Sequence, residues 1–266
     1  MFLNMDIYEY WYNRFYSKIK EGKPLLGTWI TISHPETVEI LSNMGFDWFV
    51  FDMEHAPLTI KDIEIMLMAL KGSDVIPIIR VPWNDPVYIK RALDLGVAGV
   101  LVPWVNSKNE AMEAVRAVRY PPEGIRGVGP RRCVMYGLWD SVEYFNKWNK
   151  KCILIVQVET KEAYKNLEDI LSVDGINGIF VGPSDLSASL GMYGKIDSPK
   201  FIEILKYIVS KALKYDKVAG IMTKTPEFAA KAINMGYNFI SLSHDTKFLI
   251  LGAKVFIEKT KSLAGL

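Results

Sequence analysis

The stretch GFDWFVFDMEHAP, residues 45–57, shows how this chain is built. Gly45 suits the left-handed position that ends a helix, and an apolar run follows it at once and ends in polar residues. The run is apolar almost throughout instead of alternating, as in strands that are covered on both faces. The same order of helix, glycine and apolar run recurs at Leu95-Gly96-Val97 and Met235-Gly236-Tyr237. This pattern predicts buried parallel strands that alternate with helices.

Eight such runs are separated by stretches with helical periodicity. They lie at residues 25–32, 46–53, 75–81, 97–102, 153–159, 176–181, 217–222 and 238–243. Eight strands with helical crossovers predict an α/β protein with a (β/α)8 TIM barrel. A doubly wound open sheet is ranked second, because no glycine-rich phosphate-binding motif follows the first run. We expect one domain over residues 1–266, a length that such barrels occupy as single units.

Two segments lie outside the alternation. The N-terminal residues 1–20 carry Ile7, Trp11, Phe15 and Ile19 about four positions apart, which predicts an amphipathic opening helix. Residues 120–150 have no clear periodicity, and we interpret them as an irregular insertion before the fifth strand.

The overall composition excludes several classes of function. Half of the residues are apolar and 23% are charged, as in an average globular protein. Lys plus Arg number 32 against 30 Asp plus Glu, so the chain lacks the basic excess of a nucleic-acid-binding protein. No apolar run reaches the roughly 18–20 residues of a membrane span. Cys133 and Cys152 lie too far apart to indicate a zinc cluster or a disulfide framework, which fits a reducing cytoplasm.

Polar side chains gather where four of the predicted strands end. In a barrel of parallel strands the C-terminal ends meet at one opening, where the active site of such enzymes lies. We therefore expect convergence there of Asp52, Glu54 and His55, of Arg80, of Gln157 and Glu159, and of Gly182, Pro183, Ser184 and Asp185.

Glu159 and Asp185 follow adjacent strands and could together bind a hard divalent cation. Water and substrate oxygens would complete the octahedron that Mg²⁺ or Mn²⁺ prefers. Alternatively, each carboxylate caps the helix that follows it, because ionised oxygens are stabilised by the free N–H groups at a helix start. A glycosidase pair of carboxylates is a further alternative.

His55 and Arg80 are the other candidates for chemistry. The near-neutral pKa of an ordinary histidine suits proton transfer. His55 is flanked by Asp52 and Glu54, and we rank it above His34 and His244, which are not flanked in this way. Arg80 ends an apolar strand and needs an anion, either a carboxylate such as Asp52 or a substrate. The segment from Gly182 to Asp185 opens a helix, so its N–H groups form a small anion site. Trp29 could line the opening.

Six segments in the same order carry a resemblance to a known family. They are GTW at 27–29, GFDWFVFDMEHAP at 45–57, IIRVPWNDPVYIKRALDLG at 78–96, RYPPEGIRGVG at 119–129, VQVET at 156–160 and GIFVGPSDLSASLG at 178–191. With these segments the chain resembles the HpcH/HpaI family of metal-dependent pyruvate aldolases.

The resemblance implies a role for each candidate. Glu159 and Asp185 would bind Mg²⁺ or Mn²⁺, with Co²⁺ as an alternative, and pyruvate would chelate that metal. His55 would be the base, acting through an intervening water, and Arg80 would stabilise the enolate oxygen. The matching substrate-contacting positions are Gln157, Ser184 and Asp185, and Asp94 matches the acid that the family pairs with the histidine.

Asp94 sits at the end of a helix, and helices in this fold run back to the far end of the barrel. We therefore expect Asp94, and the glycine-rich segment 126–129, to act across a subunit contact in a homo-oligomer. The resemblance suggests a hexamer, a trimer of dimers.

The expected reaction makes or breaks the C3–C4 bond of a 4-hydroxy-2-oxo acid, with pyruvate and an aldehyde as the small-molecule partners. A Lewis acid and a nearby cation would stabilise the enolate. A Schiff-base route is disfavoured because no lysine lies inside the apolar runs. The alternatives are an oxaloacetate decarboxylase or related metal-enolate lyase, and a non-catalytic barrel that binds a metabolite.

Overall fold

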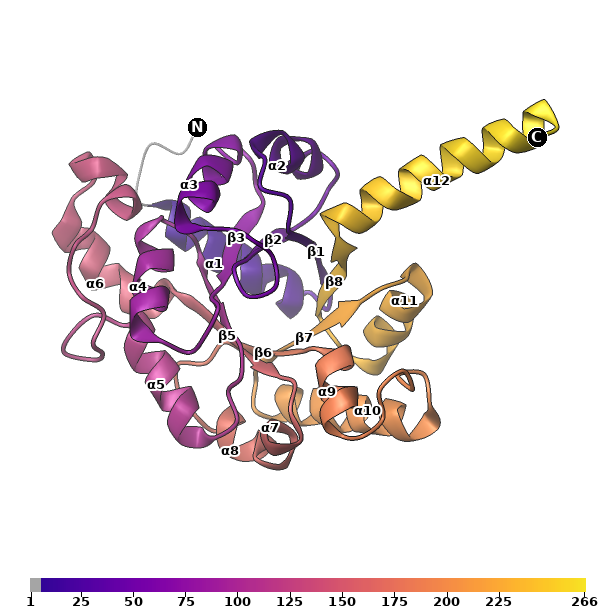
Figure 1. The fold of residues 1–266 in the computed structure, drawn as a ribbon. Helices are drawn as coiled ribbons and strands as arrows, with labels where there is room; N and C mark the ends of the chain where they lie inside the picture. The colour runs from indigo at the N-terminus through magenta and orange to yellow at the C-terminus, as the bar shows by residue number, and fades with distance from the viewer. Residues whose placement is uncertain (1–5) are drawn as a thin grey trace.

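Eight parallel strands pair in chain order, and the last pairs with the first, so the sheet closes into a barrel (Figure 1). The structure is a computed structural model that describes residues 6–266. The strands are β1 (Leu25–Ile30), β2 (Trp48–Asp52), β3 (Ile76–Arg80), β4 (Gly99–Val102), β5 (Ile153–Val158), β6 (Gly178–Val181), β7 (Val218–Thr223) and β8 (Phe239–His244). Each coincides with one of the predicted runs, so the (β/α)8 barrel is confirmed.

Helices surround the barrel and connect its strands (Figure 1). Their bounds are α1 (Asp6–Lys20), α2 (Pro35–Ser42), α3 (Ile60–Ala69), α4 (Pro86–Asp94), α5 (Lys108–Val118), α6 (Ser141–Lys151), α7 (Lys161–Lys165), α8 (Leu167–Leu171), α9 (Pro183–Ser189), α10 (Pro199–Lys214), α11 (Pro226–Met235) and α12 (Asp245–Ala264), with a 3₁₀-helix η1 (Arg132–Gly137). Ser or Thr side chains accept an N–H group at the starts of several of them, as at Thr59 of α3 and Ser107 of α5.

The apolar strands bury side chains on both faces. One set packs outwards against the helices, and a second fills the barrel interior, where Trp48 stacks on Phe239 with ring centroids 4.1 Å apart. Phe15 of α1 is fully buried in this second set, so the predicted N-terminal helix closes the end of the barrel where the strands begin. Residues 1–5 of that prediction lie outside the described residues.

The glycines after α2, α4 and α11 have the left-handed conformation that the repeat predicted. The φ angles of Gly45, Gly96 and Gly236 are +84°, +77° and +107°. A left-handed residue ends a helix and turns the chain directly towards the next strand, and glycine adopts this conformation without steric cost.

The segment 120–150 is less irregular than predicted. Its second half is the helix α6, which Asp140 caps by accepting N–H groups from Val142 and Glu143. Tyr144 and Trp148, one helical turn apart, are buried against Tyr8 of α1, with Tyr8 ring distances of 5.3 Å to each. The description as an irregular insertion is therefore wrong for α6. In the sequence, the spacing of Tyr144 and Trp148 was the feature that indicated a helix.

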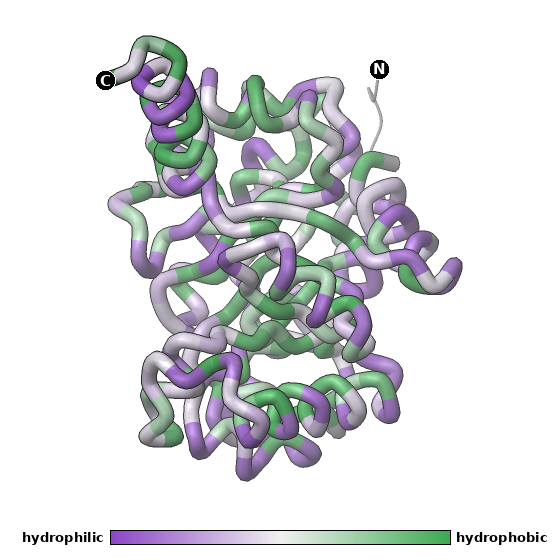
Figure 2. Tube along the Cα trace, turned by 90° about the vertical axis from the view of Figure 1, so that its right-hand side faces the viewer, coloured by the Kyte–Doolittle hydropathy of each residue, from purple (hydrophilic) through white to green (hydrophobic). Residues whose placement is uncertain are grey.

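The last helix, α12, leaves the barrel and projects away from it (Figure 1). Hydrophobic and hydrophilic residues are interleaved along its projecting part (Figure 2). From Leu249 to Leu266 every residue is exposed. Among residues 6–266, no helix combines the length and the apolar character that crossing a membrane requires.

Candidate active site

A cavity of about 460 Å³ opens at the C-terminal ends of the strands. It brings together eight of the predicted site residues, namely Trp29, His55, Arg80, Gln157, Gly182, Pro183, Ser184 and Asp185. Glu159 lines an adjoining hollow that shares Asp185 with this cavity. All the predicted site residues except Asp94 therefore lie at this opening.

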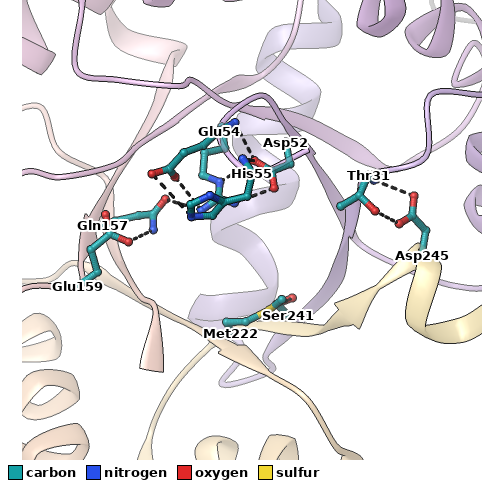
Figure 3. Close-up of polar contacts among 10 residues, drawn as sticks. Thr31, Asp52, Glu54, His55, Gln157, Glu159, Met222, Ser241 and Asp245 are labelled. Carbon is teal, nitrogen blue, oxygen red and sulfur yellow. Dashed lines mark hydrogen bonds and ion pairs between the residues drawn. The ribbon is translucent and has the colours of Figure 1, made fainter. Parts of the chain in front are cut away.

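Arg80, at the end of β3, is held by two carboxylates from the end of β2 (Figure 3). Its Nε and Nη2 donate to the two oxygens of Asp52 at 2.9 and 2.7 Å, and its Nη1 lies 2.8 Å from Oε2 of Glu54. The Arg80 side chain is only 9% exposed, so this paired, two-pronged contact compensates for its desolvation. Burial raises the pKa of Glu54, and the Arg80 charge opposes that shift.

Trp29 and Gln157 fix the remaining sides of the guanidinium. The Arg80 Cζ atom lies 4.3 Å from the ring centroid of Trp29, within the range of a cation–π contact. Gln157 Nε2 donates to Glu159 Oε2 at 2.5 Å, and its Oε1 faces Arg80 Nη1 at 3.5 Å. Gln157 thus links the arginine to the carboxylate of Glu159, which directly follows β5.

Glu159 and Asp185 converge beside Gly182. A side chain at Gly182 would place its first carbon 3.5 Å from both Glu159 Oε2 and Asp185 Oδ2, so the two carboxylates border the same small space. Glu159 Oε1 accepts the backbone N–H of Trp104 at 2.9 Å. The pKa of Glu159 is raised to about 7, mainly by burial; the nearby acids Glu54 and Asp185 add to the increase, and the hydrogen bond from Trp104 opposes it.

Glu159, which is buried, and Asp185, which is exposed, bring carboxylate oxygens to the same space, and this arrangement fits a hard divalent cation. Among residues 6–266 no group of three or more His, Cys, Asp or Glu side chains is arranged to hold a metal ion. The protein would therefore supply these two carboxylates, and the other ligands would be water and substrate oxygens.

His55 stands at the cavity rim and points into accessible space. Its side chain is 66% exposed, and Nε2 lies 3.9 Å from Glu54 Oε1. Its backbone N–H donates to Asp52 Oδ1 at 3.2 Å, so the acid that holds Arg80 also orients the turn that carries the histidine. His34, by contrast, caps α2 and does not line the cavity.

Asp94 lies elsewhere, at the end of α4, where its Oδ1 is 2.6 Å from Arg126 Nη2. The Arg126 side chain is fully buried, lies over the ring of Tyr120, and its Nη1 donates to the Tyr144 hydroxyl at 3.3 Å. Asp94 is one quarter exposed. As predicted from its position on α4, it does not line the cavity of its own chain.

Residues that sequence reasoning missed or discounted lie in the cavity wall or support its rim. Asp245 accepts the backbone N–H groups of Thr31 and Ile32 at 2.7 and 2.8 Å and so fixes the rim after β1 (Figure 3). His244 was discounted in favour of His55, yet it lines the cavity together with Lys224. In the sequence, the only indication for Lys224 and His244 was their position close after the predicted seventh and eighth strands.

Comparison with known proteins agrees with this geometry. A family model described as HpcH/HpaI aldolase/citrate lyase matches residues 25–251. The chain is 38% identical over 243 residues to a 4-hydroxy-2-oxo-heptane-1,7-dioate aldolase of Escherichia coli, covering 91% of this chain and 92% of that protein. It is 39% identical over 263 residues to a 5-keto-4-deoxy-D-glucarate aldolase of Escherichia coli O139:H28, covering 98% of both.

A solved structure has the same fold. The HpcH/HpaI aldolase/citrate lyase family protein of Burkholderia cenocepacia J2315 superposes with a TM-score of 0.88 at 30% identity, over 94% of this chain and 99% of that one. The chain therefore belongs to the HpcH/HpaI aldolase/citrate lyase family and is a carbon–carbon lyase.

Proposed function

We propose that this enzyme is a divalent-metal-dependent aldolase that cleaves or forms the C3–C4 bond of 4-hydroxy-2-oxo acids, with pyruvate and an aldehyde as its small-molecule partners. The observation that carries the proposal is the convergence of Glu159 and Asp185 at a cavity that also holds Arg80 and His55. The relatives named as aldolases support it.

Glu159 and Asp185 would hold Mg²⁺ or Mn²⁺, with Co²⁺ as an alternative. The ion would supply Lewis acidity at the keto oxygen of the substrate, which lowers the cost of the negative charge that develops when the C3–C4 bond breaks. Gln157, whose amide donates to Glu159, would keep that carboxylate oriented.

Arg80 would stabilise the enolate oxygen. Asp52, Glu54 and Gln157 engage four of the five N–H groups of the guanidinium, so one N–H group remains for the substrate. Because those carboxylates and Trp29 already fix its plane, it needs little rearrangement during the reaction.

His55 would remove the proton of the C4 hydroxyl in cleavage and return it in synthesis. Its exposed ring at the rim suits a base that reaches the aldehyde half of the substrate. The segment from Gly182 to Asp185 would bind the pyruvate carboxylate, and Trp29 would cover it.

Exchange of pyruvate methyl protons with D₂O tests enolate formation without knowledge of the aldehyde. We expect exchange by NMR with Mg²⁺ or Mn²⁺, loss of exchange with EDTA, and loss in Glu159→Gln. His55→Ala should keep metal affinity and lose about 10² to 10⁴ in the rate of aldol cleavage. Binding of metal and pyruvate without exchange would contradict the proposal and favour a metabolite-binding barrel. Pyruvate release from oxaloacetate alone would favour a decarboxylase.

We also propose that the chain, as one barrel domain, works as a homo-oligomer, with a hexamer as the expected form. The projecting part of α12 is amphipathic and exposes residues such as Leu249, Val255 and Phe256. The start of α12 packs against β1, β8 and Phe46 of its own barrel. The exposed apolar side chains further along the helix are suited to cover a second copy of the chain. Asp94 would then reach the active site of a neighbouring subunit.

A further inference from the structure

The loop after β4, residues 103–107, contains no acidic residue, yet it contacts an acid of the active site. The backbone N–H of Trp104 in this loop donates to Oε1 of Glu159 at 2.9 Å. The other oxygen, Oε2, accepts from the side chain of Gln157 on β5 (Figure 3). Each oxygen of the Glu159 carboxylate therefore has a donor from a different strand or the loop that follows it.

Trp104 makes this contact in a backbone conformation that few residues adopt. Its φ angle is +56°, in the left-handed region. A residue with a side chain has a steric cost there, because its Cβ atom comes too close to a carbonyl oxygen. Such conformations persist where the surrounding structure holds them, and they often occur at active sites. Two groups of contacts hold Trp104.

The first contact is a ring stack at the rim. The Trp104 indole stacks on that of Trp83, in the loop after β3, with ring centroids 5.8 Å apart and planes 29° apart. Both rings are large and partly exposed, so their contact removes apolar surface from water and favours the observed conformation. The Trp104 side chain also acts on Glu54. Burial raises the pKa of Glu54, and the Arg80 charge and a side-chain hydrogen bond from Trp104 oppose that shift.

The second group consists of hydrogen bonds through Asn106. Its Nδ2 donates to the Trp104 carbonyl at 3.1 Å, and its Oδ1 accepts the hydroxyl of Thr160, the residue after Glu159. The Asn106 carbonyl in turn accepts from Asn166 Nδ2 at 2.8 Å. The loop after β4 is thereby fixed to the segment that directly follows Glu159.

We propose that Trp104 is a positioning residue for the metal site: its left-handed backbone, held by the stack on Trp83, directs the N–H group that orients Glu159. The proposal rests on the proposed function, because it takes Glu159 as a ligand of the cation. With Oε1 held by this N–H, Oε2 borders the small space beside Gly182 together with Oδ2 of Asp185. Loss of a group that orients a metal ligand typically lowers metal affinity about 10- to 100-fold.

Substitutions at position 104 separate the backbone from the ring. The affinity of the metal-free protein for Mn²⁺ is measured by EPR of the unbound ion, with pyruvate present. Trp104→Ala keeps the steric cost and loses the stack, so affinity should fall about 10- to 100-fold. Trp104→Gly also loses the stack but adopts the left-handed conformation freely, so it should bind Mn²⁺ about 5- to 30-fold more tightly than Trp104→Ala. Trp104→Phe keeps a ring that can stack and should retain most of the affinity.

This order distinguishes a positioning role from packing. If the ring served only to fill space, glycine, the smaller replacement, would bind Mn²⁺ no better than alanine. Trp83→Ala removes the stack without changing the loop after β4, and it should lower the affinity by a smaller factor than Trp104→Ala.

Asp216 provides the matched control. It is also left-handed, with a φ angle of +54°, but it is exposed and precedes β7 at the far end of the barrel. Asp216→Ala and Asp216→Gly should differ from each other in urea unfolding, and both should bind Mn²⁺ as the wild type does.

Three results would overturn the role of Trp104 while leaving the metal site intact: wild-type affinity in Trp104→Ala, no gain from alanine to glycine, or an equal loss in the Asp216 variants. Circular dichroism checks folding. If Trp104→Ala does not fold, wild-type affinity in Trp83→Ala overturns the role instead. Absence of Mn²⁺ binding in the wild type would refute the proposed function, and the positioning role with it.

Discussion

Burial makes the Glu159 carboxylate the group through which the proposed metal binding would depend on pH. Its pKa in the metal-free protein is about 7, above the ordinary 4.5, so the folded state holds this proton more tightly than the unfolded chain. Folding stability therefore falls as the pH rises from about 4.5 to about 7, where the folded protein must ionise a buried acid. A bound cation would remove this cost by pairing with the carboxylate.

We therefore expect the affinity of the metal-free protein for Mn²⁺ to rise roughly tenfold per pH unit below about pH 7 and to level off above it, because the ion must displace the Glu159 proton. Titration calorimetry over this pH range measures it. Glu159→Gln should bind weakly at every pH, whereas Glu162→Gln, an exposed acid in the same hollow, should behave as the wild type. An affinity that does not change with pH in the wild type would disagree with this assignment.

At position 80 a lysine would not replace the arginine. A lysine cannot reproduce the two-pronged contact with Asp52 and the simultaneous contact with Glu54. We expect Arg80→Lys to lose about 10²-fold in kcat and about 1–3 kcal/mol of unfolding free energy, since part of the buried carboxylate pair loses its partner. Steady-state kinetics and urea unfolding measure the two effects.

Arg116→Lys, on the exposed face of α5, serves as the control and should change neither quantity. Wild-type kcat in Arg80→Lys would show that the enolate oxygen is stabilised elsewhere.

At the scale of single residues, the sequence allowed the placement of groups on strand ends but not their mutual contacts. Glu159, Asp185, Arg80 and His55 were predicted to converge because parallel strands share one C-terminal edge. The bond from Trp104 N–H to Glu159, and the second carboxylate on Arg80, depend on side-chain directions across neighbouring strands, which periodicity does not encode. Lys224 was overlooked for the same reason.

Among the elements, the turns from helix to strand differ in how tightly they are packed. Gly45 and Gly96 are both left-handed, but a side-chain carbon at Gly45 would meet no atom within 4 Å. At Gly96 it would lie 3.1 Å from the Tyr8 hydroxyl and 3.2 Å from the Cys133 Cα atom. The turn after α4 is therefore packed against α1 and η1, whereas the turn after α2 is open.

Replacing each glycine by alanine separates the cost of a left-handed backbone from the cost of crowding between packed elements. Gly45→Ala should cost about 1–2 kcal/mol, the price of the left-handed backbone alone. Gly96→Ala should cost about 1–3 kcal/mol more, because it also crowds buried neighbours. Equal losses in thermal or urea unfolding would mean that α1 and η1 move aside freely.

The elements themselves were largely predictable, and α6 shows the limit. The strands and most helices follow from apolar runs and helical spacing, because burial on one or two faces leaves a period in the sequence. The α6 segment is polar except for Val142 and its aromatic residues. Its helix depends on packing of Tyr144 and Trp148 against α1, more than 100 residues away in sequence. Such long-range support leaves only a weak local pattern.

For the whole molecule, α12 is the helix whose residues 249–266 are all exposed in the single chain. Phe256 is 78% exposed, although its ring is apolar. We expect Phe256→Glu to weaken self-association at least tenfold, because a charge would be buried at the contact. Light scattering coupled to size exclusion measures this. Lys254→Glu, also exposed on α12 but already charged, controls for the added acid. A monomeric wild type, or unchanged assembly in Phe256→Glu, would contradict the role of α12.

Subunit mixing tests whether Asp94 acts in a neighbouring active site. In its own chain Asp94 pairs with Arg126 and does not line the cavity, whereas His55 does. If a site takes His55 from one chain and Asp94 from another, the inactive variants His55→Ala and Asp94→Ala should complement each other. Random mixing of two chains in a two-fold assembly gives some sites with both residues intact, at best about a quarter of the total.

Activity should therefore appear after the two variants are unfolded and refolded together, and not when either is refolded alone. Asp94→Asn provides a second variant for mixing. It removes the charge but keeps the shape and an amide oxygen that can accept from Arg126, whereas Asp94→Ala leaves the buried guanidinium without any group in place of the carboxylate. If both Asp94 variants fold, as shown by circular dichroism, and neither mixture regains activity, Asp94 stabilises α4 within its own chain. If Asp94→Asn is fully active by itself, the contact with Arg126 is its whole function.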